Sequence, residues 1–251
     1  MLEVFFLSII QGVTEFLPIS STAHLILFAK YFNFNNESLA LDISLHLGSL
    51  LAIITYFRTD LLDFVEKKKL FYKIIISSIP VLVFGYILVK FNLIDFLRNY
   101  KLIGWCTILF GVLLYFSDLV KIKKTFKKNF TYSTALYIGF FQMLSLVPGV
   151  SRSGITITAA RFLNFNRTDS AKISFLISIP ALAAVSIYNL QNLIAEKTFE
   201  ITLINLFGII LSFIFSYVTI KFFLQYLKRF SLFSFVVYRV ILGVIILLYA
   251  Y

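Results

Sequence analysis

The chain alternates long apolar runs with short polar segments. Six of these runs reach or approach the about 20 residues that a helix needs to cross a bilayer. They cover residues 43–57, 70–91, 101–118, 173–190, 201–223 and 235–251. The pattern therefore predicts an all-α integral membrane protein with about six full transmembrane helices in a single membrane domain, 1–251.

Two other apolar regions are each divided by a polar cluster. Residues 2–17 and 23–34 flank the first cluster, and residues 132–147 and 154–164 flank the second, LVPGVSRSGIT. The second arm of each pair is too short to cross a bilayer. We therefore expect two re-entrant helical hairpins whose polar tips lie inside the membrane, where irregular backbone is tolerated only if it lines a cavity or is buried in protein.

The two halves of the chain resemble each other at an offset of about 131 residues. The matches that carry weight are polar or special residues, because chance matches among apolar residues are common in such a composition. They are Gln11 with Gln142, Ser20 with Ser151, Tyr86 with Tyr217, Lys90 with Lys221 and, after a slip of one residue, Pro18 with Pro148. We expect a first repeat over 1–118 and a second over 132–251.

Basic residues predict the orientation of these repeats. The loops 58–69, 119–131 and 224–234 are rich in Lys and Arg, whereas the loops 92–100 and 189–200 carry only Arg98 and Lys197. Loops with an excess of Lys and Arg are typically cytoplasmic. The two repeats should then have inverted topology, as in many transporters, with both termini outside.

Composition agrees with a membrane protein. The chain is 60% hydrophobic and 14% charged, whereas soluble domains are about 25% charged. The start of the chain lacks the basic segment of a cleavable signal peptide, so we expect the first apolar run to remain in the mature protein. The net charge of +11 is explained by the cytoplasmic loops, and no basic helix with interleaved aromatic residues indicates nucleic-acid binding. The single cysteine, Cys106, allows no internal disulfide.

Ionisable groups inside a membrane are costly and are functional candidates by default. In the first cluster, QGVTEFLPISSTAHL, Gln11 and Glu15 share one helix face at i and i+4, and Pro18 ends that helix. The tip then offers hydroxyls and one imidazole, from Ser20, Ser21, Thr22 and His24.

The second tip has the composition of an anion-binding site. Pro148 and Gly149 break the backbone, and Ser151 and Ser153 bracket Arg152. Arginine binds phosphate oxygens bidentately, and N–H groups at the start of the following helix add donors.

Structural roles also account for single members of these clusters. Serine and threonine often hydrogen-bond between membrane helices, His46 has the position of an interfacial or core residue, and Glu15 with Arg152 alone could be a structural ion pair. The occurrence of both clusters at repeat-related tips favours a functional site.

The segments QGVTEFLPISSTAHLIL and PGVSRSGITIT resemble the two motifs of the undecaprenyl-diphosphate phosphatase family, also called the bacitracin-resistance protein family. The resemblance covers the whole chain, through LHLGSLLA and KRFSLFSFVVYR. It implies hydrolysis of undecaprenyl diphosphate to undecaprenyl phosphate and phosphate, at the outer, periplasmic side of the bacterial inner membrane. This reaction recycles the lipid carrier of peptidoglycan synthesis.

The resemblance also assigns roles to residues. Glu15 matches the motif glutamate, Ser21 the favoured nucleophile, His24 the motif histidine, and Arg152 the arginine assigned to the diphosphate. Gln11 stands where relatives have Glu or Gln. We expect Glu15 and the diphosphate to hold a divalent cation, magnesium or calcium. Further substrate contacts are expected from Ser20, Thr22, Ser151, Ser153 and Gln11.

Two alternatives remain open at this stage. The phosphorus is attacked either by the Ser21 hydroxyl, with His24 or Glu15 as base, or directly by water. The same architecture also suits a polyprenyl-phosphate transporter or flippase and, with less support, a channel. The apolar faces of the spans, which lie among membrane lipids, would also allow a homodimer.

Overall fold

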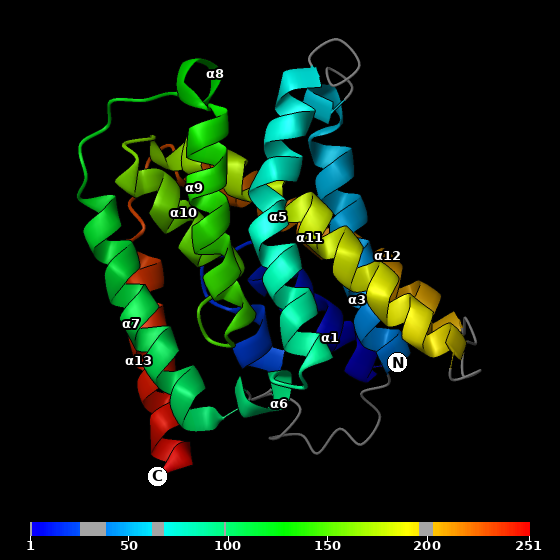
Figure 1. The fold of residues 1–251 in the computed structure, drawn as a ribbon. Helices are drawn as coiled ribbons and strands as arrows, with labels where there is room; N and C mark the ends of the chain where they lie inside the picture. The colour runs from blue at the N-terminus through cyan, green and yellow to red at the C-terminus, as the bar shows by residue number, and fades with distance from the viewer. Residues whose placement is uncertain (1, 26–38, 62–67, 98, 196–202) are drawn as a thin grey trace.

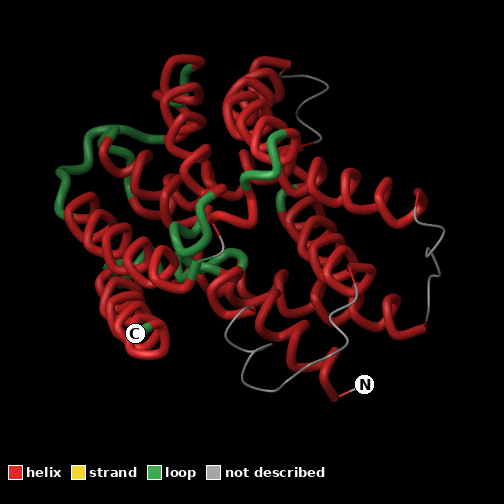
Figure 2. Tube along the Cα trace, turned by 60° about the horizontal axis from the view of Figure 1, so that its bottom comes forward, coloured by secondary structure: helices red, strands yellow, loops and turns green. Residues whose placement is uncertain are grey.

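The computed structural model describes residues 2–25, 39–61, 68–97, 99–195 and 203–251. Within these ranges the protein is built from helices, and the only β pairing is an isolated bridge between Lys124 and Phe165 (Figure 2). The helices are α1 (Leu2–Thr14), α3 (Leu39–Tyr56), α5 (Lys68–Lys90), α6 (Ile94–Leu97), α7 (Tyr100–Asp118), α8 (Phe126–Asn129), α9 (Tyr132–Met143), the 3₁₀ helix η1 (Leu144–Leu146), α10 (Arg152–Phe162), α11 (Arg167–Ala195), α12 (Leu203–Tyr226) and α13 (Phe233–Ala250).

In the part of the chain that the structure describes, five helices are long and apolar enough to span a membrane, namely α5, α7, α11, α12 and α13. They coincide with five of the six predicted spans, and the protein is a multi-pass membrane protein. The sixth predicted span, 43–57, forms the apolar helix α3, which is shorter. Helix α11 extends beyond its predicted span of 173–190 at both ends, because the polar residues that flank the apolar run continue the helix.

Many polar side chains lie inside the helix bundle beside its apolar core, and many large apolar side chains lie on its outside. Ser49 on α3 contacts Ser212 and Ser216 on α12 at oxygen–oxygen distances of 3.1 and 3.0 Å, and all three side chains are fully buried. Large apolar side chains such as Leu109 and Phe222 are about 60% exposed. Hydroxyl groups are common between membrane helices because they hydrogen-bond across the interface.

Several of the most extensive helix pairs join opposite halves of the chain. In Figure 1, α7 and α13 lie side by side; α1 packs on α12, and α9 packs on α5. Glycines permit two of these close approaches. A Cβ on Gly12 would lie 2.6 Å from the Cβ of Phe215, and one on Gly139 would lie 2.2 Å from the carbonyl oxygen of Ser77.

Each polar cluster follows one of these short helices. The first follows α1, and the chain becomes helical again from Ser21 to Leu25. The second follows α9 and η1, and α10 then begins at Arg152. Helix α10 corresponds to the predicted arm 154–164, whereas most of the predicted arm 23–34 lies outside the described residues.

Candidate functional site

The two polar clusters face each other across a cavity of about 180 Å³. The first cluster contributes Glu15, Ser20, Ser21 and Thr22 to its wall, and the second contributes residues that include Gly149, Ser151 and Arg152. His46 on α3 also lines the cavity. Val81, Ala181, Leu182 and Val185, from α5 and α11, make one side apolar. The cavity therefore combines a polar floor with an apolar wall.

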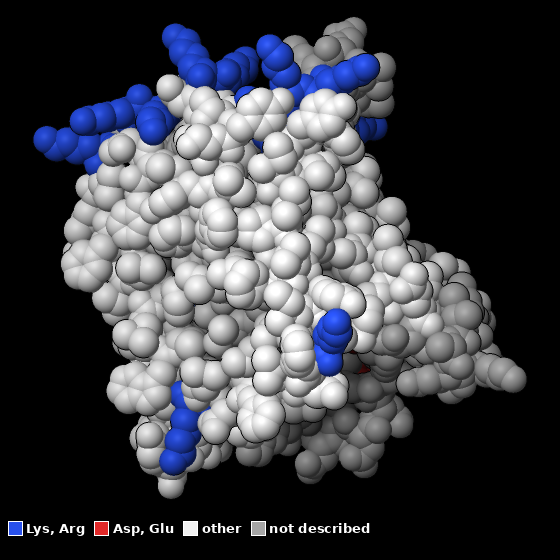
Figure 3. All heavy atoms as spheres, viewed as in Figure 1, with Lys and Arg blue, Asp and Glu red and all other residues white. Residues whose placement is uncertain are grey.

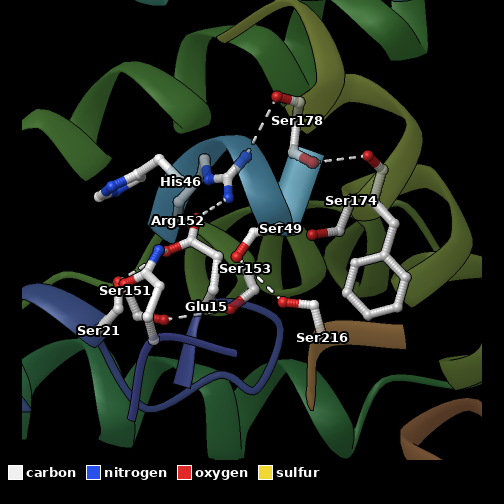
Figure 4. A network of polar contacts seen from close by, with 12 residues as sticks. Glu15, Ser21, His46, Ser49, Ser151, Arg152, Ser153, Ser174, Ser178 and Ser216 are labelled. Atoms are coloured by element: carbon white, nitrogen blue, oxygen red, sulfur yellow. Dashed lines mark hydrogen bonds and ion pairs between the residues drawn. The ribbon is translucent and has the colours of Figure 1, made fainter. Parts of the chain in front are cut away.

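An ion pair between Glu15 and Arg152 joins the two clusters (Figure 4). The Glu15 carboxylate is 7% exposed, and one of its oxygens, Oε1, accepts from Arg152. The other oxygen, Oε2, accepts from Gln11 Nε2 at 3.1 Å and from Ser21 Oγ at 2.9 Å. The Arg152 guanidinium also donates to the carbonyl oxygen of Ser178 at 3.3 Å. A buried charge needs such partners to offset its desolvation.

Both tips place a serine in the left-handed region of backbone conformation. Ser20 has a φ of 74° and Ser151 a φ of 69°, and the two positions are separated by the offset of the sequence repeat. This conformation is uncommon for residues other than glycine, and strained positions cluster at functional sites. The hydroxyl of Ser153 donates to the carbonyl oxygen of Leu17 at 2.7 Å, which ties the second tip to the first.

The N-terminus of α10 opens into the same cavity. Ser151 caps this helix, because its hydroxyl oxygen accepts from Gly154 N at 3.2 Å. The first N–H groups of a helix have no partner within the helix and favour bound anions. Together with Arg152, this helix start makes the second tip suitable for a phosphate group.

The two histidines have different surroundings. The ring of His24 stacks on Tyr238, its Nε2 lies 2.5 Å from the Tyr238 hydroxyl, and its Nδ1 lies 2.7 Å from the carbonyl oxygen of Ser20. His24 is not among the residues that line the cavity described above. His46 does line it, and its Nδ1 lies 2.9 Å from the carbonyl oxygen of Asp42. Sequence analysis ranked His24 above His46, and the structure adds His46 to the candidates.

Most of the predicted site residues lie in or directly behind the cavity wall. Gln11 and Ser153 stand behind it, where Gln11 donates to Glu15 and Ser153 joins the tips. Sequence analysis gave no role to Arg239, a fully buried arginine of α13 that donates to the backbone of both tips. Its position within the apolar run 235–251 is the signal that identifies it, because charged residues are costly in a membrane.

A metal ion would have a single carboxylate ligand in this cavity. The described residues contain no group of three or more His, Cys, Asp or Glu side chains that could hold a metal ion. Magnesium bound with a phosphorylated substrate needs only one or two protein carboxylates, since phosphate and water oxygens complete its shell. Glu15 therefore fits a divalent cation that arrives with a diphosphate and not one held by the protein alone.

Comparison with known proteins identifies relatives along the whole chain. The family model described as Bacitracin resistance protein BacA matches residues 4–245. A protein of Pelagibacter ubique (strain HTCC1062) named undecaprenyl-diphosphatase is 51% identical over 251 residues, which cover 100% of this chain and 98% of the relative. Proteins with the same name from Saccharophagus degradans and Jannaschia sp. are 39% and 36% identical, covering 96% and 99% of this chain and 95% and 98% of the relatives.

Proposed function

Because the chain belongs to the bacitracin resistance protein BacA family, we propose that it is a membrane phosphatase that hydrolyses undecaprenyl diphosphate to undecaprenyl phosphate and phosphate. The observation that carries this proposal is the cavity in which Glu15, Ser21 and Arg152 converge from two tips. Its activity recycles the lipid carrier of peptidoglycan synthesis and confers bacitracin resistance.

The second tip binds the diphosphate in this proposal. Arg152 presents a planar fork to phosphate oxygens, and the start of α10 adds N–H donors. The guanidinium is also paired with Glu15. The diphosphate therefore has to take Arg152 from Glu15, which exchanges one ionic partner for another and leaves the carboxylate available. The hydroxyls of Ser20, Thr22 and Ser151 complete the polar floor.

The first tip performs the chemistry. Ser21 Oγ already donates to Glu15 Oε2 at 2.9 Å, which is the geometry required for a base that activates a hydroxyl. Ser21 Oγ forms a bond to the terminal phosphorus, its proton passes to Glu15, and the anhydride P–O bond breaks to release undecaprenyl phosphate. Water then hydrolyses the phosphoserine. The alternative is direct attack on the phosphorus by a water molecule that Glu15 activates.

His24 supports the first tip in this scheme. Through its contact with the carbonyl oxygen of Ser20, it fixes the residue that precedes the nucleophile. A divalent cation, magnesium or calcium, would be held by Glu15 and the diphosphate and would neutralise charge on the phosphates. The polyprenyl tail would lie against the apolar wall formed by Val81, Leu182 and Val185.

The proposed topology is an inverted repeat with re-entrant hairpins. It is supported by the exchange of partners between halves, since α1 packs on α12 and α9 packs on α5. Lys and Arg side chains gather at the end of the molecule where α8 lies, and both termini lie toward the other end (Figures 1 and 3). The positive-inside rule then places α8 in the cytoplasm and the termini outside.

Cysteine labelling tests this orientation. Single cysteines at Asn129, on α8, and Asn92, after α5, are introduced into a variant that lacks Cys106. A membrane-impermeant reagent should label the two positions from opposite sides of sealed vesicles. Labelling from the same side would contradict the proposed topology.

Phosphate release tests the function itself. The purified protein in detergent is given undecaprenyl diphosphate with magnesium or calcium, and the same reaction is run with a chelator. We expect release of phosphate that the chelator suppresses. No release with any divalent cation, together with transport of polyprenyl phosphate in vesicles, would instead support a transporter. The names of the relatives do not favour that alternative.

A further inference from the structure

Arg239 on α13 is fully buried and donates to four backbone carbonyl groups. Its Nε lies 3.1 Å from the oxygen of Thr107 on α7, and its Nη1 lies 3.4 Å from that of Pro18. Its Nη2 lies 2.9 and 3.0 Å from the oxygens of Gly149 and Val150. Among the described residues no carboxylate forms an ion pair with Arg239. Within the same residues its hydrogen-bond acceptors are thus all peptide carbonyl groups.

Three of these carbonyl groups belong to the two tips of the candidate site. Pro18 lies two residues before Ser20, and Gly149 and Val150 immediately precede Ser151. The backbone at Gly149 is also held from the other side, because a Cβ there would lie 2.5 Å from the oxygen of Ile103. The second tip is thus clamped between α7 and the guanidinium.

The clamp determines where the N–H group of Ser151, the last residue before α10, points. Peptide units are planar and trans, so a carbonyl oxygen and the following N–H point in opposite directions. The Val150 oxygen points to Arg239, and the N–H of Ser151 must therefore point away from it. Within the described residues the backbone N–H groups of Ser151, Arg152 and Ser153 have no acceptor. Ser151 and Arg152 line the cavity, and Ser153 stands directly behind its wall.

We propose that Arg239 is a positioning residue for phosphate release: it orients the N–H groups of the second tip toward the transferred phosphate, and its charge adds to that of Arg152. The proposal rests on the phosphatase function proposed above. Preorganised N–H groups stabilise the charge that develops on oxygen in a transition state, and loss of one such donor costs about 100- to 1,000-fold in kcat.

Arg161 provides a matched control within the same chain. It is also fully buried, and it also donates to backbone carbonyl groups, those of Asp118 at 2.9 Å, Val120 at 2.7 Å and Phe165. It lies in the last turn of α10, away from the cavity, and it has the Asp118 carboxylate at 3.6 Å. If the loss of any buried arginine that binds carbonyl groups impairs the protein, the effect should appear at both positions.

The experiment compares Arg239→Lys with Arg161→Lys. Lysine keeps the charge but cannot reach several carbonyl groups with a planar fork. Folded yield, thermal unfolding, kcat and KM for undecaprenyl diphosphate are measured for both. We expect both variants to lose stability. Only Arg239→Lys should lose kcat, by about 10- to 100-fold with a smaller change in KM, because oriented donors act on the transition state.

Several outcomes would overturn the proposal. One is that folded Arg239→Lys has the kcat of wild type. Another is that Arg161→Lys loses as much kcat as Arg239→Lys. If Arg239→Lys does not fold, Arg239→Gln, which keeps two N–H donors, replaces it. Failure of both to fold while Arg161→Lys folds would show a purely structural clamp.

Wild-type phosphate release is measured first, so that failure of the phosphatase function is recognised separately. If wild type is inactive, calorimetric binding of inorganic pyrophosphate tests Arg239 without turnover. Weaker binding by Arg239→Lys than by Arg161→Lys is then expected, and equal binding would refute the role of Arg239.

Discussion

The two tips share a backbone form but differ in how closely Arg239 holds them. Each has a left-handed serine followed by the start of a helix. The second tip is fixed by two short bonds from Arg239 to the carbonyl groups of Gly149 and Val150, whereas the first receives from Arg239 only the 3.4 Å contact at Pro18. The tip that Arg239 holds more closely carries Arg152. The other tip, where Ser153 and His24 contact the backbone, carries Glu15 and Ser21.

This difference suits the two tasks that we propose. A site for a diphosphate gains from rigid donors, because their orientation costs nothing when the substrate binds. The first tip has to adjust when Arg152 leaves Glu15 for the substrate, and a proton has to move there. The tips thus divide binding from chemistry, and the following predictions test that division.

The largest effect is expected at the chemical tip. Glu15→Gln removes the proposed base and cation ligand, and hydrolysis should fall by about 1,000-fold or more at every metal concentration. The protein should still fold, because the glutamine oxygen can accept from Arg152 while its amide nitrogen donates to the hydroxyl oxygen of Ser21 and to the Gln11 side chain after rotation of its amide. If the pair with Arg152 were only structural, the main result would be a loss of about 3–5 kcal/mol of stability. Folded yield measured beside the rate decides between these outcomes, and a folded, fully active variant contradicts both.

The next effect is expected at the binding tip. Arg152→Lys keeps the charge but loses the planar fork, and we expect about a 100-fold loss in kcat/KM. Steady-state kinetics on undecaprenyl diphosphate measure it. Arg167→Lys, which replaces a guanidinium that binds Asp118 outside the cavity, is the control and should remain close to wild type. Unchanged turnover in Arg152→Lys would refute bidentate binding.

The contact between His24 and Tyr238 should couple the first tip to α13. His24→Phe and Tyr238→Phe keep the stacked rings but lose the hydrogen bond. The loss of kcat/KM in the double variant should be smaller than the product of the two single losses. The coupling should be about 1 kcal/mol, or about fivefold in kcat/KM. A double-mutant cycle measures this coupling. Fully multiplicative losses would show that His24 acts without Tyr238.

Gln11→Glu should change the demand for metal and little else. A second carboxylate beside Glu15 should lower the divalent-cation concentration for half-maximal rate by a few-fold, because hard cations prefer carboxylate oxygens. Gln142→Glu, at the repeat-related position, is the control and should leave the metal dependence unchanged. A metal titration of phosphate release compares the two variants. Identical shifts in both would mean that Gln11 is not near the cation.

The smallest effect concerns the two left-handed serines. Glycine adopts this conformation without strain, so Ser20→Gly should stabilise the protein by about 0.5–1 kcal/mol. Ser151→Gly should be close to neutral, since it also removes the hydroxyl that caps α10. Thermal unfolding in detergent measures both. Equal stabilisation would show that the Ser151 cap contributes nothing.

Sequence patterns predicted some features of this molecule well. The spans were evident because each apolar run is long, and the contact between Glu15 and Arg152 follows from polar tips that have to meet inside the bundle. The role of Arg239 was not predicted, because its partners are backbone carbonyl groups distant in the sequence and no residue pattern marks them. The position of His46 depends on the rotation of α3 about its axis, which local sequence does not determine.

Gln142 differs in its surroundings from Gln11, its counterpart in the proposed repeat. Its side chain is fully buried, and within the described residues neither polar atom of its amide has a hydrogen-bond partner. At the offset of the repeat, Gln142 corresponds to Gln11, Leu146 stands where the first half has Glu15, and Arg152 stands where it has Ser21. In the proposed repeat, Gln142 therefore occupies the position of Gln11 in a half that has no carboxylate at the position of Glu15.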